Sequence, residues 1–178
     1  MTARVARLPI TILNGFLGSG KTTLLQNLLV QSRRKEDVRL GVIINEMSEL
    51  DVDGRILDAT EILSRQDALF ASIPAGSISG ADGLVKFNAA VTTLRQGGAT
   101  HIIIETSGST HPWPLLEAIR GHEAVQLQGF LSVVDTVTLL QDHDAGEAII
   151  PAAQRYLAGD TRGIENLLAE QIMFAASF

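Results

Sequence analysis

Apolar residues in this chain gather in short runs of two kinds that alternate along the sequence. Runs of the first kind are rich in β-branched residues and end in turn residues, which is typical of buried parallel strands. Runs of the second kind place leucines and other apolar residues at the spacing of an amphipathic helix. We expect strands at residues 10–13, 39–45, 68–73, 101–105 and 129–135, and helices at residues 21–31, 84–94, 112–120 and 164–176.

This alternation of strands and helices indicates an α/β fold, in which helices cover both faces of a mostly parallel sheet. The 178 residues are enough for one domain with its own core, so we expect residues 1–178 to form a single domain. The pattern also calls for a strand after the last helix, where the sequence stops. Because an unpaired edge strand favours aggregation, we interpret the sequence as shortened from a longer protein rather than as a natural remnant.

Composition narrows the class of protein. Hydrophobic residues make up 46% and charged residues 19%, which is typical of a globular domain. The formal net charge of -6 argues against a nucleic-acid binder, which normally presents a basic face. The absence of cysteine excludes disulfides and thiolate metal sites within these residues. No apolar run is long enough to span a bilayer, and no signal-peptide core precedes the first strand, so we expect a cytoplasmic protein without a membrane partner.

The stretch GFLGSGKTTLL follows the first expected strand and leads into the first expected helix. It fits the phosphate-loop pattern G-x-x-x-x-G-K-[ST]. Glycines at Gly15, Gly18 and Gly20 let the backbone curl so that its N–H groups point at one anion, and the helix N-terminus adds its dipole. Lys21 then supplies positive charge to the β- and γ-phosphates, and the Thr22 hydroxyl is a ligand for Mg²⁺. A glycine turn beside a surface lysine is the weaker alternative, because the motif and its strand–helix context agree.

The strand at residues 101–105 ends in Glu105, and Gly108 follows three residues later. A carboxylate at the carboxyl end of a parallel strand lies beside the phosphate site, where it can hold a Mg²⁺-bound water or orient the attacking water. Gly108 can offer an unobstructed N–H to the γ-phosphate. The alternative for Glu105 is a strand-end residue that caps the next helix.

An acidic stretch, NEMSELDVDG, follows the second expected strand. A loop in this position could reach the γ-phosphate and sense its loss. The candidate residues are Glu46, Glu49, Asp51 and Asp53, with Glu46 also a candidate Mg²⁺ ligand beside Thr22 and Glu105. For each of the four taken singly, a solvated acidic loop is an equally good interpretation.

Four stretches, GFLGSGKTTLL, VIINEMSELDVDG, IIIETSGSTHPWPL and FLSVVDTVTLL, resemble the CobW family of P-loop GTPases in their order and spacing. The resemblance covers residues 8–178. It implies a P-loop GTPase that uses GTP and Mg²⁺ and takes part in metal-cofactor assembly or cobalamin synthesis, as a metallochaperone with a metalloenzyme client; it also allows a homodimer. It implies phosphate and Mg²⁺ binding by Gly18, Ser19, Gly20, Lys21, Thr22 and Thr23, with Glu46 and Glu49 in a switch loop and residues 105–108 in a γ-phosphate-sensing motif. The phosphate-loop pattern and the strand-end motif add Gly15 and Gly108 to the expected phosphate site, and we expect Lys21 and Glu105 to be the catalytic residues.

The sequence departs from the family pattern in two places. The family's C-x-C-C metal motif aligns with GSISG, where Ser77, Ile78 and Ser79 precede Gly80. Serine hydroxyls are poor ligands for Zn²⁺ or Co²⁺, so the usual soft-metal site is absent. His111 could touch a metal or the switch, but we interpret it as a partly exposed polar residue at a helix start. The family's guanine-selecting N-K-x-D motif also lies beyond the last helix, which leaves GTP and ATP undistinguished by these residues.

Two other functions fit the same phosphate loop. A small-molecule kinase would place arginines on a lid near the leaving phosphate, and Arg155 and Arg162 could have that role. A nucleotide-gated binding module would bind the same nucleotide with little turnover. The sensing motif and the acidic loop favour an NTP hydrolase over the kinase.

Overall fold

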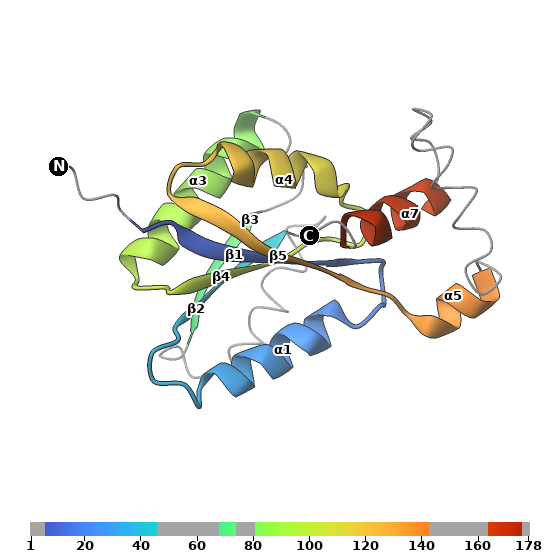
Figure 1. The fold of residues 1–178 in the computed structure, drawn as a ribbon, viewed down its shortest axis with the longest axis horizontal. Coiled ribbons are helices and arrows are strands. Elements are labelled where there is room, and N and C mark those ends of the chain that lie inside the picture. Colours follow the sequence, from blue (N-terminus) through green and yellow to red (C-terminus); the bar gives the residue numbers. More distant parts are fainter. Residues whose placement is uncertain (1–5, 46–67, 74–80, 143–163, 176–178) are drawn as a thin grey trace.

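The computed structural model of this chain describes residues 6–45, 68–73, 81–142 and 164–175. Its centre is a five-stranded parallel sheet with strand order β3-β2-β4-β1-β5 (Figure 1). The strands are β1 (Leu8–Gly15), β2 (Leu40–Asn45), β3 (Ala68–Ile73), β4 (His101–Glu105) and β5 (Val125–Val133). An α/β fold with a parallel sheet is therefore confirmed.

Helices cover both faces of the sheet. They are α1 (Lys21–Ser32), α3 (Ala81–Gln96), α4 (Pro112–Gly121), α5 (Thr136–Asp142) and α7 (Ile164–Ala175). Figure 1 shows α3, α4 and α7 on one face and α1 on the other. Because successive strand residues point to opposite faces, β1 sends Ile12 into the core beneath α3 and α4, and Leu13 into the core beneath α1.

Burial on both faces explains why the interiors of the central strands β2 and β4 are continuous apolar runs. In β2 every residue is buried, and in β4 only His101 is partly exposed. A strand covered by helices on both sides has no solvent face, so its sequence is a continuous apolar run instead of an alternation. The central strands were therefore recognisable from composition alone.

The predicted elements agree with the structure to within three residues at each end, except around β5. This strand starts at Val125, four residues before the predicted start at residue 129. Its pairing with β1 shifts register between Ile10 and Thr11, because Ile10 pairs with Leu127 while Thr11 pairs with Gly129. The extra residue interrupts the period-two alternation along β5. The first half of the strand therefore does not show the sequence pattern by which strands are recognised.

Helix α5 was not predicted. It begins right after Asp135, whose side chain accepts a hydrogen bond from the backbone N–H of Val137 at 3.2 Å. This residue was assigned to the end of the preceding strand, although Asp is also a common helix N-cap. Exposed apolar residues on α5, including Val137 and Leu140, further obscure its helical pattern.

Candidate functional site

The candidate site lies at the carboxyl edge of the sheet, where β1 and β4 end side by side. Leu13 in β1 pairs with Glu105 in β4, and Ile44 in β2 pairs with the same glutamate from the other side. The loop that leaves β1 therefore rises next to the Glu105 carboxylate. Strand order and register bring together residues that are far apart in sequence.

The loop between β1 and α1 adopts the curled backbone that its glycines allow. Gly15, Gly18 and Gly20 have φ angles of 144°, 79° and 95°, a region that residues with a Cβ rarely occupy. A Cβ on Gly15 would also lie 2.2 Å from the Val133 carbonyl oxygen of β5. The loop thus needs glycine at this position for space as well as for conformation.

Lys21 is the first residue of α1 and is buried, with 7% of its surface exposed. Its Nζ donates hydrogen bonds of 2.9 Å to the carbonyl oxygens of Gly15 and Phe16. The ammonium group is therefore held inside the curl of the loop instead of extending into solvent. A surface lysine beside a glycine turn does not fit this geometry.

The next residue, Thr22, connects the loop to β4. Its hydroxyl donates a 2.6 Å hydrogen bond to the Glu105 carboxylate, which is 4% exposed. Glu105 does not cap the following helix, because α4 begins at Pro112 with His111 at its N-cap position. The strand-end cap considered from sequence is therefore excluded by the bond to Thr22 and by the start of α4.

The pair of oxygen-bearing side chains suits a hard divalent cation. Mg²⁺ prefers oxygen ligands and is commonly held by one or two protein groups together with substrate phosphates. The Thr22 hydroxyl and the Glu105 carboxylate supply two such oxygen ligands next to the phosphate loop. Within the described ranges, no group of three or more His, Cys, Asp or Glu side chains could hold a metal ion by itself.

Asn14 is a site residue that the sequence interpretation missed. Its side chain is fully buried, and its Oδ1 accepts hydrogen bonds from the Gly15 N–H at 2.7 Å and the Thr106 hydroxyl at 2.8 Å. One amide oxygen thus joins the start of the phosphate loop to the residue after Glu105. A polar residue that ends an apolar strand was the available signal, because such a buried group needs partners.

The segment after Glu105 packs directly on the phosphate loop. A Cβ on Gly108 would lie 2.5 Å from the backbone nitrogen of Leu17. Glycine is therefore required at position 108 because two backbones approach each other closely there. This is a second role, in addition to the N–H that the sequence led us to expect near the γ-phosphate. Gly18, Ser19, Gly20 and Thr23 lie in or just after the same loop, so the structure brings together all the predicted phosphate-site residues that it describes.

Several predicted residues lie outside the described residues. They are Glu46, Glu49, Asp51 and Asp53 of the acidic loop, Ser77, Ile78, Ser79 and Gly80 of the GSISG stretch, and Arg155 and Arg162. His111 is described: its side chain is 49% exposed at the start of α4, as expected, and its Nδ1 lies 2.5 Å from Glu170 Oε2. The sequence did not indicate this contact.

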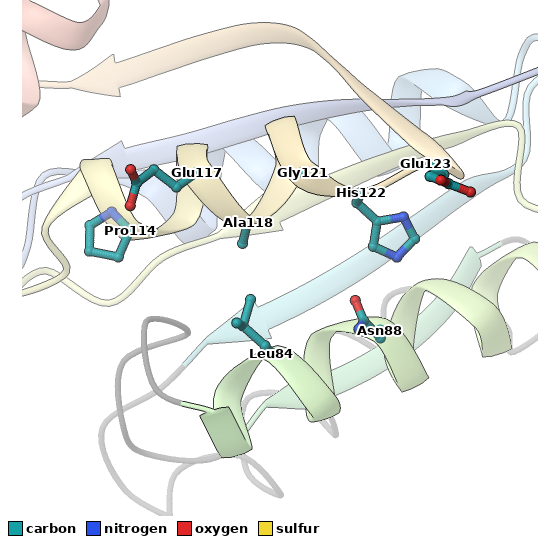
Figure 2. Close-up of a pocket in the computed structure, with 8 residues that line it drawn as sticks. All are labelled: Leu84, Asn88, Pro114, Glu117, Ala118, Gly121, His122 and Glu123. Carbon is teal, nitrogen blue, oxygen red and sulfur yellow. The ribbon is translucent and has the colours of Figure 1, made fainter.

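A cavity of about 630 Å³ lies elsewhere, between α3 and α4 (Figure 2). Burial and the nearby Arg95 lower the pKa of the imidazole of His122, which lines the cavity, and Glu123 partly offsets this. None of the phosphate-loop residues lines this cavity, so it is separate from the candidate site. Its lining residues are Leu84, Asn88, Pro114, Glu117, Ala118, Gly121, His122 and Glu123.

A glycine-rich loop between a buried strand and a helix, with its lysine turned inward and its threonine bonded to a strand-end carboxylate, defines a P-loop nucleotide-binding domain. A model of the CobW/HypB/UreG nucleotide-binding domain family matches residues 9–178. The chain belongs to this family.

Curated relatives agree with this assignment. The chain is 34% identical to a zinc chaperone CobW from Sinorhizobium over 83% of its length and 43% of the relative's. It is 29% identical to zinc-regulated GTPase metalloprotein activator 1 from Dictyostelium discoideum, over 95% of its length and 38% of that protein's. The chain thus spans less than half the length of these two relatives.

A solved structure supports the fold. The signal recognition particle receptor FtsY from Elizabethkingia anophelis matches with a TM-score of 0.58 at 18% identity, over 100% of this chain and 57% of that one. At this identity the match concerns the fold alone. In the part of the chain that the structure describes, no helix is both long and apolar enough to cross a membrane.

Proposed function

We propose that this domain binds GTP together with Mg²⁺ and hydrolyses it, and that the cycle supports metal delivery or metallocofactor assembly. The observation that carries the proposal is the hydrogen bond from Thr22 to Glu105, which couples the phosphate loop to the end of β4. The choice of GTP is supported by family membership and by a relative named as a GTPase.

In the proposed complex, Lys21 turns from the Gly15 and Phe16 carbonyls toward the β- and γ-phosphates. Its buried position keeps the ammonium close to the anion, and a charge acts more strongly where water is excluded. The backbone N–H groups of the loop and the N-terminus of α1 complete an anion site.

Thr22 and Glu105 are the proposed Mg²⁺ residues, with Glu46 as a third. The bound cation would neutralise charge that develops on the phosphates. In the proposed complex the Glu105 carboxylate would also accept a hydrogen bond from the attacking water and so orient it. Asn14 supports this arrangement, because it ties Thr106 to the base of the phosphate loop.

The metal role is proposed from the relatives, since two of them are named as a zinc chaperone and a zinc-regulated metalloprotein activator. We propose a metalloprotein client for this chain also, and a cytoplasmic location. A homodimer and a link to cobalamin synthesis belong to the same proposal.

Calorimetric titration with the slowly hydrolysed analogue GTPγS, with and without Mg²⁺, tests the proposed site. Removing the hydroxyl in Thr22→Val should abolish most of the gain in affinity that Mg²⁺ gives to the unchanged protein. Thr93→Val, at an exposed position on α3, is the matched control and should keep that gain. Equal dependence on Mg²⁺ in both variants would contradict the assignment of Thr22.

A further inference from the structure

Helix α7 buries two consecutive polar side chains. Glu170 is 2% exposed and Gln171 is fully buried. Burial of a carboxylate and an amide is unfavourable unless each has polar partners. The partners of these two residues therefore show what this part of α7 is built to contact.

Both side chains contact the same short loop, residues 106–111, which connects β4 to α4. Gln171 Nε2 lies 3.4 Å from the Gly108 carbonyl oxygen and 3.5 Å from the Thr110 carbonyl oxygen, so it forms two long hydrogen bonds. Glu170 Oε2 lies 2.5 Å from Nδ1 of His111. α7 is thus fastened to this loop through adjacent residues on one turn.

The same loop also meets the phosphate loop. Gly108 approaches Leu17 so closely that a Cβ would lie 2.5 Å from the Leu17 nitrogen. A γ-phosphate bound between these two loops would have to be accommodated by Gly108, and the peptide group that follows Gly108 is held by Gln171. A shift of the loop therefore reaches α7 through a direct contact.

An aromatic contact links the two helices beside this loop. Trp113, in the first turn of α4, packs on Phe174 of α7 with ring centroids 5.9 Å apart, and Phe174 lies 6.5 Å from Phe130 of β5. Trp113 is 43% exposed and is the one tryptophan in these 178 residues. Movement of α7 relative to α4 would change the surroundings of this indole.

We propose that Gln171 is a positioning residue: its hydrogen bonds to the Gly108 and Thr110 carbonyls keep the loop where Gly108 can accommodate the γ-phosphate. Through the same bonds, a change of nucleotide at Gly108 is transmitted to α7. The inference rests on the proposed function, because it needs a bound nucleotide. If the Gln171 amide were only structural, its loss would change the affinities for the diphosphate and the triphosphate by the same factor. If it positions the loop for the γ-phosphate, its loss lowers the affinity for the triphosphate more than the affinity for the diphosphate.

Tryptophan fluorescence and affinity, measured with GDP and with GTPγS, separate these roles. In the unchanged protein, the emission of Trp113 should differ between the two nucleotides, and Trp113→Phe should remove that difference. In Gln171→Leu and in the isosteric Gln171→Glu, which cannot donate to carbonyls, the emission difference should disappear. GTPγS affinity should fall about three- to tenfold relative to GDP affinity, the size of one lost neutral hydrogen bond.

Gln96→Leu, at an exposed position at the end of α3, is the control and should behave as the unchanged protein does. If the Gln171 variants do not fold, His111→Asn tests the contact between α7 and this loop through the neighbouring His111–Glu170 pair, in which His111 is the half-exposed partner. This variant should also reduce the emission difference. If the protein binds neither nucleotide, the proposed function fails. If it binds both but Trp113 responds equally to each, or if the Gln171 variants retain the GDP-to-GTPγS affinity ratio, this inference alone is overturned.

Discussion

The Thr22 hydroxyl and the Glu105 carboxylate lie 83 residues apart in sequence and 2.6 Å apart in space. The first belongs to the helix that follows the phosphate loop, and the second ends β4. Their contact depends on the placement of β4 directly beside β1. Strand order therefore assembles the cation-binding part of the proposed site.

Lys21→Ala should remove most of the affinity for a nucleoside triphosphate. Loss of one charge-assisted contact to phosphate costs about 2 to 3 kcal/mol, or roughly 30- to 150-fold in affinity. Lys86→Ala, at an exposed position on α3, is the control. Calorimetry that gave the same dissociation constant for both variants would overturn the phosphate-loop assignment.

Glu105→Gln should leave nucleotide binding nearly unchanged and slow hydrolysis by roughly tenfold or more, since the interaction with the attacking water is made mainly in the transition state. The amide oxygen can still accept the hydrogen bond from Thr22, and it remains an oxygen ligand for Mg²⁺ or its bound water. Single-turnover phosphate release measures the effect, with Glu117→Gln on the exposed side of α4 as the control. Normal turnover combined with lost binding would indicate a structural role for Glu105.

Gly108→Ala should displace the loop after β4, because its Cβ would lie 2.5 Å from the Leu17 nitrogen. Overpacking of this kind costs about 1–3 kcal/mol in the free energy of unfolding, and triphosphate affinity should fall as well. Gly121→Ala is a matched control, since a Cβ there meets nothing within 4 Å. Urea denaturation and GTPγS titration of the two variants should therefore give different results; identical results would contradict the close approach of the two loops.

His122 should make stability depend on pH. Burial, with a contribution from Arg95 that Glu123 partly offsets, lowers the pKa of this imidazole, and its Nδ1 accepts a hydrogen bond from the Ala124 N–H at 3.1 Å. The unfolded chain, with a histidine pKa of about 6.5, then binds the proton more readily than the folded chain. The stabilisation from neutral His122 is therefore fully present above that pH and is lost as the pH falls from it toward the lower pKa of the folded chain.

The comparison with His122→Gln isolates this effect from that of other groups. Denaturation of both proteins between about pH 7.5 and 5.5 should show the advantage of the unchanged protein shrinking toward the acid end. An advantage that stayed constant or grew would mean that the imidazole is not held neutral by its surroundings.

Zinc should not bind this chain stoichiometrically with high affinity, although its relatives include a protein named as a zinc chaperone. The chain has no cysteine, and the resemblance noted in the sequence implies that Ser77 and Ser79 replace thiols of the family's metal motif. Equilibrium dialysis against Zn²⁺ and Co²⁺ with elemental analysis tests this. One tightly held Zn²⁺ per chain would show that histidines or carboxylates replace the thiols.

The sequence was sufficient for the parts of the fold that depend on local pattern. Strand β4 was predicted with its observed bounds, because a strand buried on both faces is a continuous apolar run. The phosphate loop was found from its glycines and Lys21, whose spacing is itself the signal. The start of β5 and the whole of α5 were missed, the first because of a register shift beside Leu127 and the second because Asp135 was assigned to a strand.

Contacts between segments that are distant in sequence could not be predicted from the sequence pattern. Asn14, Gln171 and the pairing of His111 with Glu170 depend on which strands and helices are neighbours, and no local periodicity encodes this. A buried polar residue at the end of an apolar strand, as at Asn14, indicates that a partner exists without indicating which one.

Phosphate release from GTP in the presence of Mg²⁺, with no acceptor molecule added, is the measurement that tests the central claim most directly. If the phosphate loop and Glu105 form a hydrolase site, the unchanged protein releases phosphate and Lys21→Ala releases almost none. Glu105→Gln should bind GTP but release phosphate at a rate that is lower by roughly tenfold or more. Tight GTP binding without phosphate release would support a binding module or a kinase and would contradict the account.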